Sequence, residues 1–301
     1  MGAAALLAAS LAAAGSSALA QELEPRSYAN APVGLNFLIA GYGYAAGGVT
    51  FDPSVPLTNA HVQTHGAVLA YVRALDFWGK SGKVDIVLPY AWVSGSAEVG
   101  GELRERSVSG PGDPRLRLSV NLLGAPALSP QEFAGYRQDL ILGVSLQVWV
   151  PLGQYDGDFL VNIGTNRWAF KPELGISKAL GRLTLELAAG VAFYTENSDF
   201  YGGVTRAQDP ISSVQGHVIY AFGNGIWAAL NGTYYAGGRT TTGGVEGDDL
   251  QTNSRLGLTV ALPVNRRNSL KLYGSTGTST RTGSDFDAVG VAWQFRWGGG
   301  L

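Results

Sequence analysis

The chain has 301 residues, 43 glycines, no cysteine and a net charge of −2. The absence of cysteine excludes disulfides and thiolate metal sites, and a chain this close to neutral offers no basic patch dense enough for nucleic acid. High glycine content together with 10% aromatic residues favours many short strands joined by tight turns.

The first 20 residues form an Ala/Leu-rich run that ends in Ala18-Leu19-Ala20, directly before Gln21. Signal peptidase requires small residues at this spacing, so the pattern predicts a signal peptide over residues 1–20 that is cleaved to leave residues 21–301. The run departs from the usual signal because no Lys or Arg precedes it. Beyond Gln21 no apolar run approaches the ~20 residues that a membrane-spanning helix needs, and a closed barrel is the other structure that spans a bilayer.

From about Asn36 to Trp297 the sequence repeats segments of about ten residues in which apolar residues alternate with polar or small ones. In one segment Leu116 and Leu118 share a face and Arg115 and Arg117 share the other, since side chains along a strand alternate between its two faces. Nearly every segment repeats this pattern, which is typical of a barrel with lipid outside and a polar interior. The predicted strands, about twelve as an even-numbered bacterial barrel requires, are 34–46, 60–76, 82–97, 113–124, 138–151, 165–178, 181–196, 211–222, 225–237, 250–263, 268–280 and 285–297.

The connections between the predicted strands alternate between short and long. Short turns are expected at 80–82, 180–181, 223–225 and 265–268, and longer polar loops at 47–59, 98–112, 152–164, 197–210, 237–249 and 278–284. This segregation predicts periplasmic turns at one end, extracellular loops at the other, and both termini in the periplasm. Residues 125–137 are the exception on the short side, where Ser129-Pro130-Gln131-Glu132 predicts a capped, brief helix.

Aromatic residues near the strand ends predict where the barrel meets the membrane surface. They share parity with the aliphatic residues beside them, so we expect an interfacial girdle against outer-membrane lipids. The members of this girdle are Tyr90, Trp92, Trp168, Phe170, Phe193, Tyr220, Trp293, Phe295 and Trp297. The last strand is also similar to the C-terminal signal recognised by the outer-membrane assembly machinery, although Gly298 to Leu301 follow its last aromatic residue.

The opposite parity predicts a charged inner wall. Arg117 and Arg255 are expected to face the lumen with Glu173 and Glu186 among their ion partners, because unpaired charges inside a low-dielectric wall are costly. Two interpretations stay open: a narrow polar passage that selects a small solute, and a plug of ion-paired side chains that stiffens the barrel. The predicted lumen-lining residues are Arg73, Asp85, Arg115, Arg117, Asn121, Arg167, Lys171, Glu173, Glu186, His217, Arg255 and Lys271.

The sequence predicts no catalytic residues, no metal site and no cofactor. His61 and His65 share a face but lack carboxylates at a ligand-like spacing. Ser213 and His217 also share strand parity, which keeps a membrane lipid hydrolase open as an alternative. The third group that would orient such a histidine is not identifiable in the sequence.

Several motifs, in a fixed order, carry a resemblance to a known family. They include Gly41-Tyr42-Gly43-Tyr44, Gly112-Asp113-Pro114-Arg115-Leu116-Arg117 and the specific run Gly164-Thr165-Asn166-Arg167-Trp168. Over nearly its whole mature length the chain resembles the family of outer-membrane proteins named for the meta-pathway of phenol degradation, often labelled "transporter". The resemblance implies an outer-membrane barrel that passes aromatic or other small hydrophobic compounds, and it supplies no catalytic or binding residues.

We therefore expect an all-β protein, a single transmembrane antiparallel barrel of about twelve strands in the bacterial outer membrane, exported through a cleaved signal peptide. Its expected function is passive diffusion of a small solute, with aromatic compounds indicated by the resemblance alone. The alternatives are a lipid hydrolase and a structural barrel with a plugged lumen. For the fold, the alternative is a soluble β-sandwich, which would bury one face of each strand.

Overall fold

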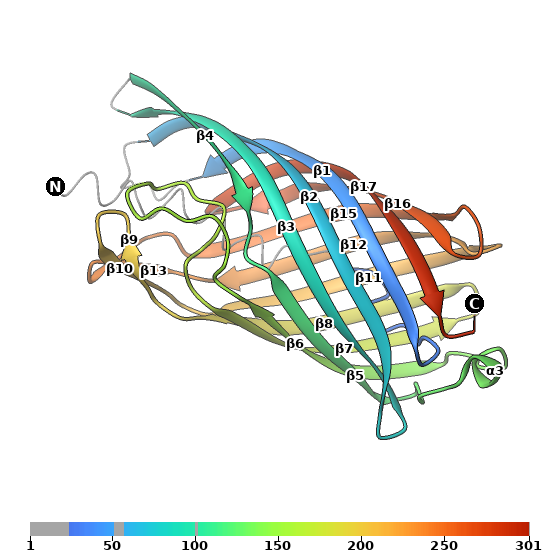
Figure 1. Cartoon of the computed structure of the whole chain (residues 1–301). Helices are drawn as coiled ribbons and strands as arrows, with labels where there is room; N and C mark the ends of the chain where they lie inside the picture. Colours follow the sequence, from blue (N-terminus) through green and yellow to red (C-terminus); the bar gives the residue numbers. More distant parts are fainter. Residues whose placement is uncertain (1–23, 51–56, 100–101, 301) are drawn as a thin grey trace.

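The computed structural model describes residues 24–50, 57–99 and 102–300. The signal peptide expected over residues 1–20 lies outside this described part of the chain. Most of the described residues lie in strands, and these strands wrap into a barrel (Figure 1).

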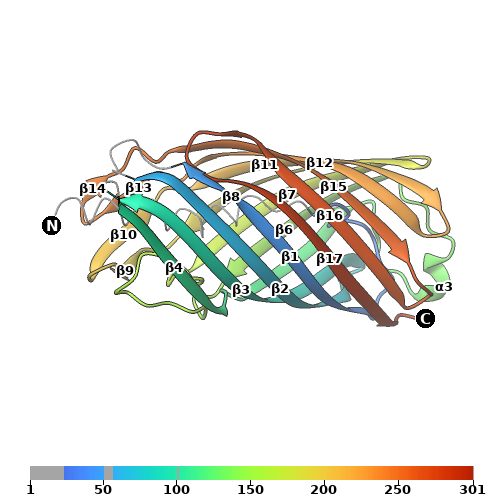
Figure 2. The same ribbon diagram turned by 90° about the horizontal axis from the view of Figure 1, so that it is seen from above.

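Twelve of the described strands form the barrel wall. In the order in which they pair around it, they are β1 (Leu35–Thr50), β2 (Leu57–Phe77), β3 (Lys80–Val99), β5 (Arg115–Leu123), β6 (Leu140–Trp149), β7 (Ala169–Leu180), β8 (Leu183–Tyr194), β11 (Ile211–Gly223), β12 (Ile226–Gly237), β15 (Gln251–Pro263), β16 (Asn268–Thr280) and β17 (Gly283–Gly298). All neighbours are antiparallel, and β17 pairs back onto β1 to close the barrel (Figure 2). The predicted all-β, twelve-stranded barrel is confirmed.

The two-faced strands explain why the sheet closes on itself. Leu116 and Leu118 are 43% and 44% exposed on the outside, whereas Arg115 and Ser119 are buried on the inside. The same parity leaves large apolar and aromatic side chains exposed around the barrel, including Trp92 and Trp293 of the predicted girdle. A single closed sheet with an apolar exterior contradicts the β-sandwich alternative. No helix within residues 24–50, 57–99 and 102–300 is long and apolar enough to cross a membrane.

Short turns gather at one end of the barrel, as expected. The turn between β2 and β3 lies at Trp78-Gly79 rather than at 80–82, and both residues have positive φ, as the tight hairpin turn that matches strand twist requires. The connection between β5 and β6 is longer than the other connections at this end and contains α3 (Pro130–Phe133). The side chains of Ser129 and Glu132 form a reciprocal capping box there. The predicted brief helix is therefore confirmed.

The other end carries more regular structure than the sequence indicated. The predicted loop 98–112 contains β4 (Glu102–Pro111), which continues the sheet along the outer half of β3 beyond β5. The predicted loops 197–210 and 237–249 contain β9 (Asn197–Phe200), β10 (Val204–Gln208), β13 (Thr240–Thr242) and β14 (Val245–Glu246), which form a separate small sheet (Figure 2). The strands of the small sheet are too short for an alternating pattern to identify, because their stability depends on tertiary packing.

Candidate functional site

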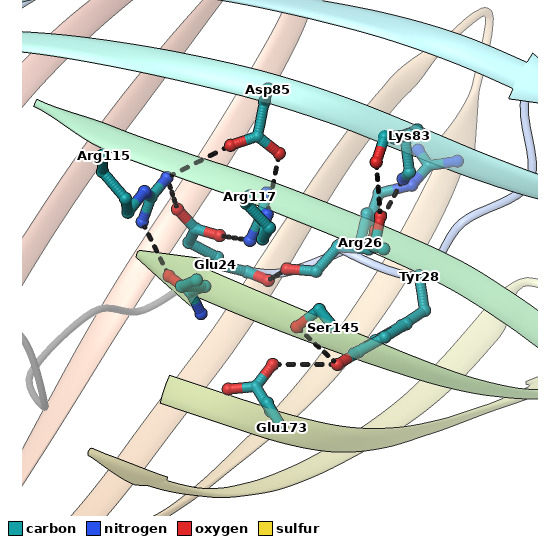
Figure 3. A network of polar contacts seen from close by, with 12 residues as sticks. Glu24, Arg26, Tyr28, Lys83, Asp85, Arg115, Arg117, Ser145 and Glu173 are labelled. Atoms are coloured by element: carbon teal, nitrogen blue, oxygen red, sulfur yellow. Dashed lines mark hydrogen bonds and ion pairs between the residues drawn. The ribbon is translucent and has the colours of Figure 1, made fainter. Parts of the chain in front are cut away.

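The barrel lumen contains a stretch of the chain itself, residues 24–31, here called the N-terminal segment. It precedes β1 and takes no part in the barrel's strand pairing. Its side chains reach the inner faces of β5, β6 and β7, and Lys83 of β3 bonds to its backbone (Figure 3). The lumen, narrowed by this segment, is the candidate functional site.

Ion pairs hold the start of the N-terminal segment. The Glu24 carboxylate contacts Arg115 at 3.0 Å and also bonds to Arg117, both on β5. Arg117 Nε donates to Asp85 on β3 at 2.8 Å, and Arg115 lies 3.8 Å from the same carboxylate. Two arginines and two carboxylates therefore neutralise one another in a largely dry setting, and Glu24 supplies half of the negative charge (Figure 3).

Tyr28 anchors the middle of the segment in a socket on the adjoining strands β6 and β7. Gly143 of β6 and Gly175 of β7 are register partners, and a Cβ on either would lie 2.4 Å or 2.0 Å from the Tyr28 ring. The two glycines therefore create the space that the ring fills. The hydroxyl group of Tyr28 donates a hydrogen bond to Glu173 at 3.0 Å. The socket therefore contacts the ring at the two glycines and binds the hydroxyl group through a carboxylate.

Wall side chains also satisfy the backbone of the N-terminal segment. Lys83 Nζ donates to the carbonyls of Ser27 and Ala29, and Asn121 Nδ2 donates to the carbonyl of Tyr28 at 3.1 Å. The backbone N–H of Arg26 donates to Glu186 at 2.7 Å. A segment outside the strand ladder still needs partners for its backbone polar groups, and the charged wall provides them.

A cavity of about 680 Å³ lies between the N-terminal segment and the short-turn end of the barrel. Its wall on β1 and β2 is apolar, with Phe37 and Ile39 from one strand and Val68 and Val72 from the other. Polar and charged residues line other parts of the cavity, among them Lys271 of β16, which is separated from β1 only by β17. The lumen therefore combines an apolar surface with fixed charges, as small-molecule pockets commonly do.

Among the predicted lumen-lining residues, Asp85, Arg115, Arg117, Asn121, Glu173 and Glu186 are brought together around the N-terminal segment. Lys171 pairs with Glu173 at 3.4 Å, and Lys271 lines the cavity. Of the other predicted positions, His217 is the register partner of Glu186, and its Nδ1 donates to Asn231 Oδ1 at 2.8 Å. Arg167 and Arg255 are buried farther toward the long-loop end.

The predicted ion partners of two arginines are wrong. Arg117 pairs with Glu24 and Asp85, and Arg255 donates to Ser275 and to the Phe286 carbonyl. Parity fixes which face a residue takes, but it does not fix the register between neighbouring strands, which places Asp85 beside Arg117. Glu24 also precedes every predicted strand, so no strand pattern could have assigned it.

Arg73 does not line the lumen, which corrects the expectation for this residue. It is exposed and paired in register with Val84, which faces outward, while Val68, Ala70 and Val72 of the same strand face the cavity. Both faces of β2 are apolar here, so alternation carries no signal. An arginine close to the short-turn end can extend its charged group from the outer face to water.

Two pairs of residues singled out by the sequence do not assemble into reactive sites. Ser213 and His217 both face inward but stand four positions apart on β11, about 13 Å along the strand. They bond to different partners: Ser213 to the carbonyl of Gly190, and His217 to Asn231. His65 is exposed and bonds to Tyr42, and the described part of the chain contains no cluster of three or more potential metal-ligating residues.

Arg167 belongs to a second buried group, near the small sheet at the long-loop end. Its guanidinium lies over the Tyr194 ring at 4.5 Å and donates to Gln208, while Arg206 lies over the Phe200 ring at 5.0 Å. Burial lowers the pKa of Arg167 to about 10 and that of Arg206 to about 9. Both remain cationic at neutral pH, and the cluster fixes the small sheet over this end of the barrel.

Comparisons with known proteins agree with this architecture. A family model described as "Putative MetA-pathway of phenol degradation" matches residues 43–295. No curated protein matches the chain in sequence. Among solved structures, the chain is similar to the COG4313 outer membrane channel from Pseudomonas putida F1, with a TM-score of 0.80 and 19% identity over 92% of this chain and 100% of that one.

It is also similar to the transport unit of the autotransporter AIDA-I from Escherichia coli, with a TM-score of 0.56 and 8% identity over 98% of this chain and 97% of that one. The beta domain of the Bordetella autotransporter BrkA gives a TM-score of 0.52 and 11% identity over 88% and 100% of the two chains. Identities this low show a shared fold, the barrel of outer-membrane proteins.

Proposed function

This chain belongs to the phenol-degradation family whose model it matches, and we propose that small solutes cross the bacterial outer membrane through its lumen by passive diffusion. The observation that carries the proposal is the cavity of about 680 Å³ inside a closed barrel. The family description directs the choice of solute toward aromatic compounds. The apolar wall on β1 and β2 is consistent with that choice, because a ring can lie against it.

A solute can pass through the lumen only if there is space beside the N-terminal segment or if the segment moves. Its attachment to the wall consists of side-chain contacts, such as Glu24 with Arg117 and Tyr28 with Glu173. Breaking them does not break the strand pairing that closes the barrel, since the segment lies outside that pairing. Movement of the segment can therefore open the lumen while the wall stays intact.

The direct test refolds the full chain into liposomes and measures uptake of phenol, benzoate and glucose above the rate of protein-free liposomes. We expect faster uptake of at least one aromatic solute, and we expect single-channel conductance in a planar bilayer. Liposomes with the same mass of heat-denatured protein are the control. If the folded protein adds neither uptake nor conductance, the proposal is wrong.

A second candidate is a structural barrel with a permanently plugged lumen, and the bonded N-terminal segment favours it. Absence of uptake and conductance would support this candidate. The lipid hydrolase has no such observation, because Ser213 and His217 bond to different partners. A lipid-release assay on the same liposomes tests it, since activity lost in His217→Ala would favour an enzyme.

Location and partners belong to the same proposal. Export through a cleaved signal peptide would deliver the chain to the outer-membrane assembly machinery, which would recognise its last strand. The exposed apolar belt, with Trp92 and Trp293 among its aromatic residues, is suited to outer-membrane lipids. Extraction from outer-membrane vesicles by detergent but not by sodium carbonate is the expected behaviour.

A further inference from the structure

The lining of the 680 Å³ cavity carries more positive than negative charge, although the whole chain has a net charge of −2. Two carboxylates, Glu24 and Asp85, belong to the lining. They are opposed by six cationic side chains, namely Arg26, Lys83, Arg115, Arg117, Lys271 and Arg296. Arg115 and Arg117 share the two carboxylates between them, so the remaining cations are not neutralised by an ion pair within this lining.

Lys271 differs from the other cations in what surrounds its ammonium group. Lys83 donates to two backbone carbonyls, Arg296 donates to the carbonyl of Arg266, and the Arg26 guanidinium lies over the Trp227 ring at 5.4 Å. Lys271 has no hydrogen-bond, ion-pair or ring partner among the described residues. Its neighbours across the sheet on both sides are alanines, Ala261 and Ala292. These small residues flank Lys271, which lines the cavity.

The surroundings of this ammonium group define a ligand with two parts. Removing a cation from bulk water without a partner is unfavourable, so an anion that reaches Lys271 gains a charge-assisted hydrogen bond at a site already partly desolvated. The wall of Phe37, Ile39 and Val72 in the same cavity offers an apolar surface. A volume of about 680 Å³ lies within the range of about 300–1,000 Å³ usual for small-molecule pockets.

We propose that the cavity binds an organic carboxylate, with its carboxylate on Lys271 and its apolar body against β1 and β2. This inference rests on the proposed function and narrows its solute class from small aromatic compounds in general to anions with an apolar body. Lys271 then acts as a specificity-determining residue. A neutral phenol would occupy the same wall without the ionic contact.

The test measures binding rather than passage. The full chain is refolded into nanodiscs of neutral phosphatidylcholine, and equilibrium dialysis measures binding of benzoate, benzyl alcohol and acetate. Benzyl alcohol keeps the ring without the charge, and acetate keeps the charge without the ring. We expect saturable benzoate binding, with both comparison ligands bound about tenfold more weakly or worse. Cyclohexanecarboxylate separates an aromatic from an aliphatic body, and binding of either acid supports a carboxylate site.

Variants at one position identify the contact. Lys271→Gln should weaken benzoate binding about tenfold or more and leave benzyl alcohol binding unchanged, whereas Lys271→Arg should retain most of the benzoate affinity. The control is Lys178→Gln, a matched change on β7 at a lysine outside the cavity lining that pairs with Asp139. Equal benzoate binding by Lys271→Gln and the unchanged protein would overturn the inference, as would equal binding of benzoate and benzyl alcohol.

The two proposals fail in different ways. If benzoate binds through Lys271 but liposomes take up no solute, the passage proposal is wrong and the carboxylate site stands. If liposomes take up phenol and benzoate at equal rates and Lys271→Gln binds benzoate normally, passage stands and the carboxylate site is wrong.

Discussion

At the scale of single residues, the lumen is shaped as much by missing side chains as by charged ones. Gly143 and Gly175 sit side by side on β6 and β7 and leave the space in which the Tyr28 ring lies. The sequence showed two glycines at inward positions of predicted strands, which is a signal for close approach of another group. It could not show that the group belongs to the same chain, because Tyr28 precedes every predicted strand.

Gly175→Ala should loosen the N-terminal segment. A Cβ there would lie 2.0 Å from the Tyr28 ring, so the ring must leave its socket, while strand pairing between β6 and β7 is unaffected. We expect a higher single-channel conductance with little change in unfolding. The matched control is Gly66→Ala, since Gly66 also lies within a barrel strand and no atom lies within 4 Å of its added Cβ. Equal conductance in the two variants would show that the socket does not hold the segment.

Arg117→Ala should destabilise the folded barrel by roughly 3–5 kcal/mol, because it leaves Asp85 and Glu24 buried with only Arg115 to share. The comparison variant is Arg73→Ala, whose side chain is exposed on the outer face and should change stability by less than about 1 kcal/mol. Urea unfolding in detergent micelles, followed by tryptophan fluorescence, measures both. Similar losses for the two variants would contradict the inner position of Arg117.

At the scale of elements, the barrel strands were predictable and the segments that occupy or cover the lumen were not. The period-two pattern located β5 and β11 within a few residues, since lipid on one side and a polar interior on the other force strict alternation. That pattern does not exist in the N-terminal segment, whose position depends on contacts with the finished wall, or in the two-residue strand β14, which depends on its pairing with β13. It also fails on β2, where both faces are apolar and Arg73 was assigned to the wrong side.

Replacing residues 24–31 by a Gly/Ser stretch of equal length should widen the passage without unfolding the barrel. The replacement removes the Glu24 ion pairs and the Tyr28 anchor, while all twelve wall strands keep their partners. We expect a larger and steadier single-channel conductance than that of the unchanged chain. Circular dichroism should still report the β-sheet content. A conductance equal to that of the unchanged chain would show that this segment does not limit passage.

At the scale of the whole molecule, polar and apolar side chains are distributed in the opposite way to a water-soluble protein, and this distribution accounts for the fold. Apolar side chains such as Leu118 and Leu146 are exposed on the outside, while charged groups such as Asp85 and Lys171 are buried within. Such a surface needs lipid or detergent around it. We expect the folded protein to run faster than its unfolded form on detergent gels unless it is boiled. A protein that is monomeric in buffer without detergent would contradict this arrangement.

The central claim is that solutes pass through the lumen, and the absence of cysteine allows a direct test of this route. Ala292 and Val291 are adjacent on β17, but Ala292 lines the cavity while Val291 is exposed on the outer face. Each is changed to cysteine in a separate variant, and benzoate uptake by liposomes is measured before and after treatment with a bulky thiol reagent. We predict that modification slows uptake severalfold in Ala292→Cys and leaves it unchanged in Val291→Cys. Complete labelling of Ala292→Cys with no change in uptake would contradict passage through the lumen.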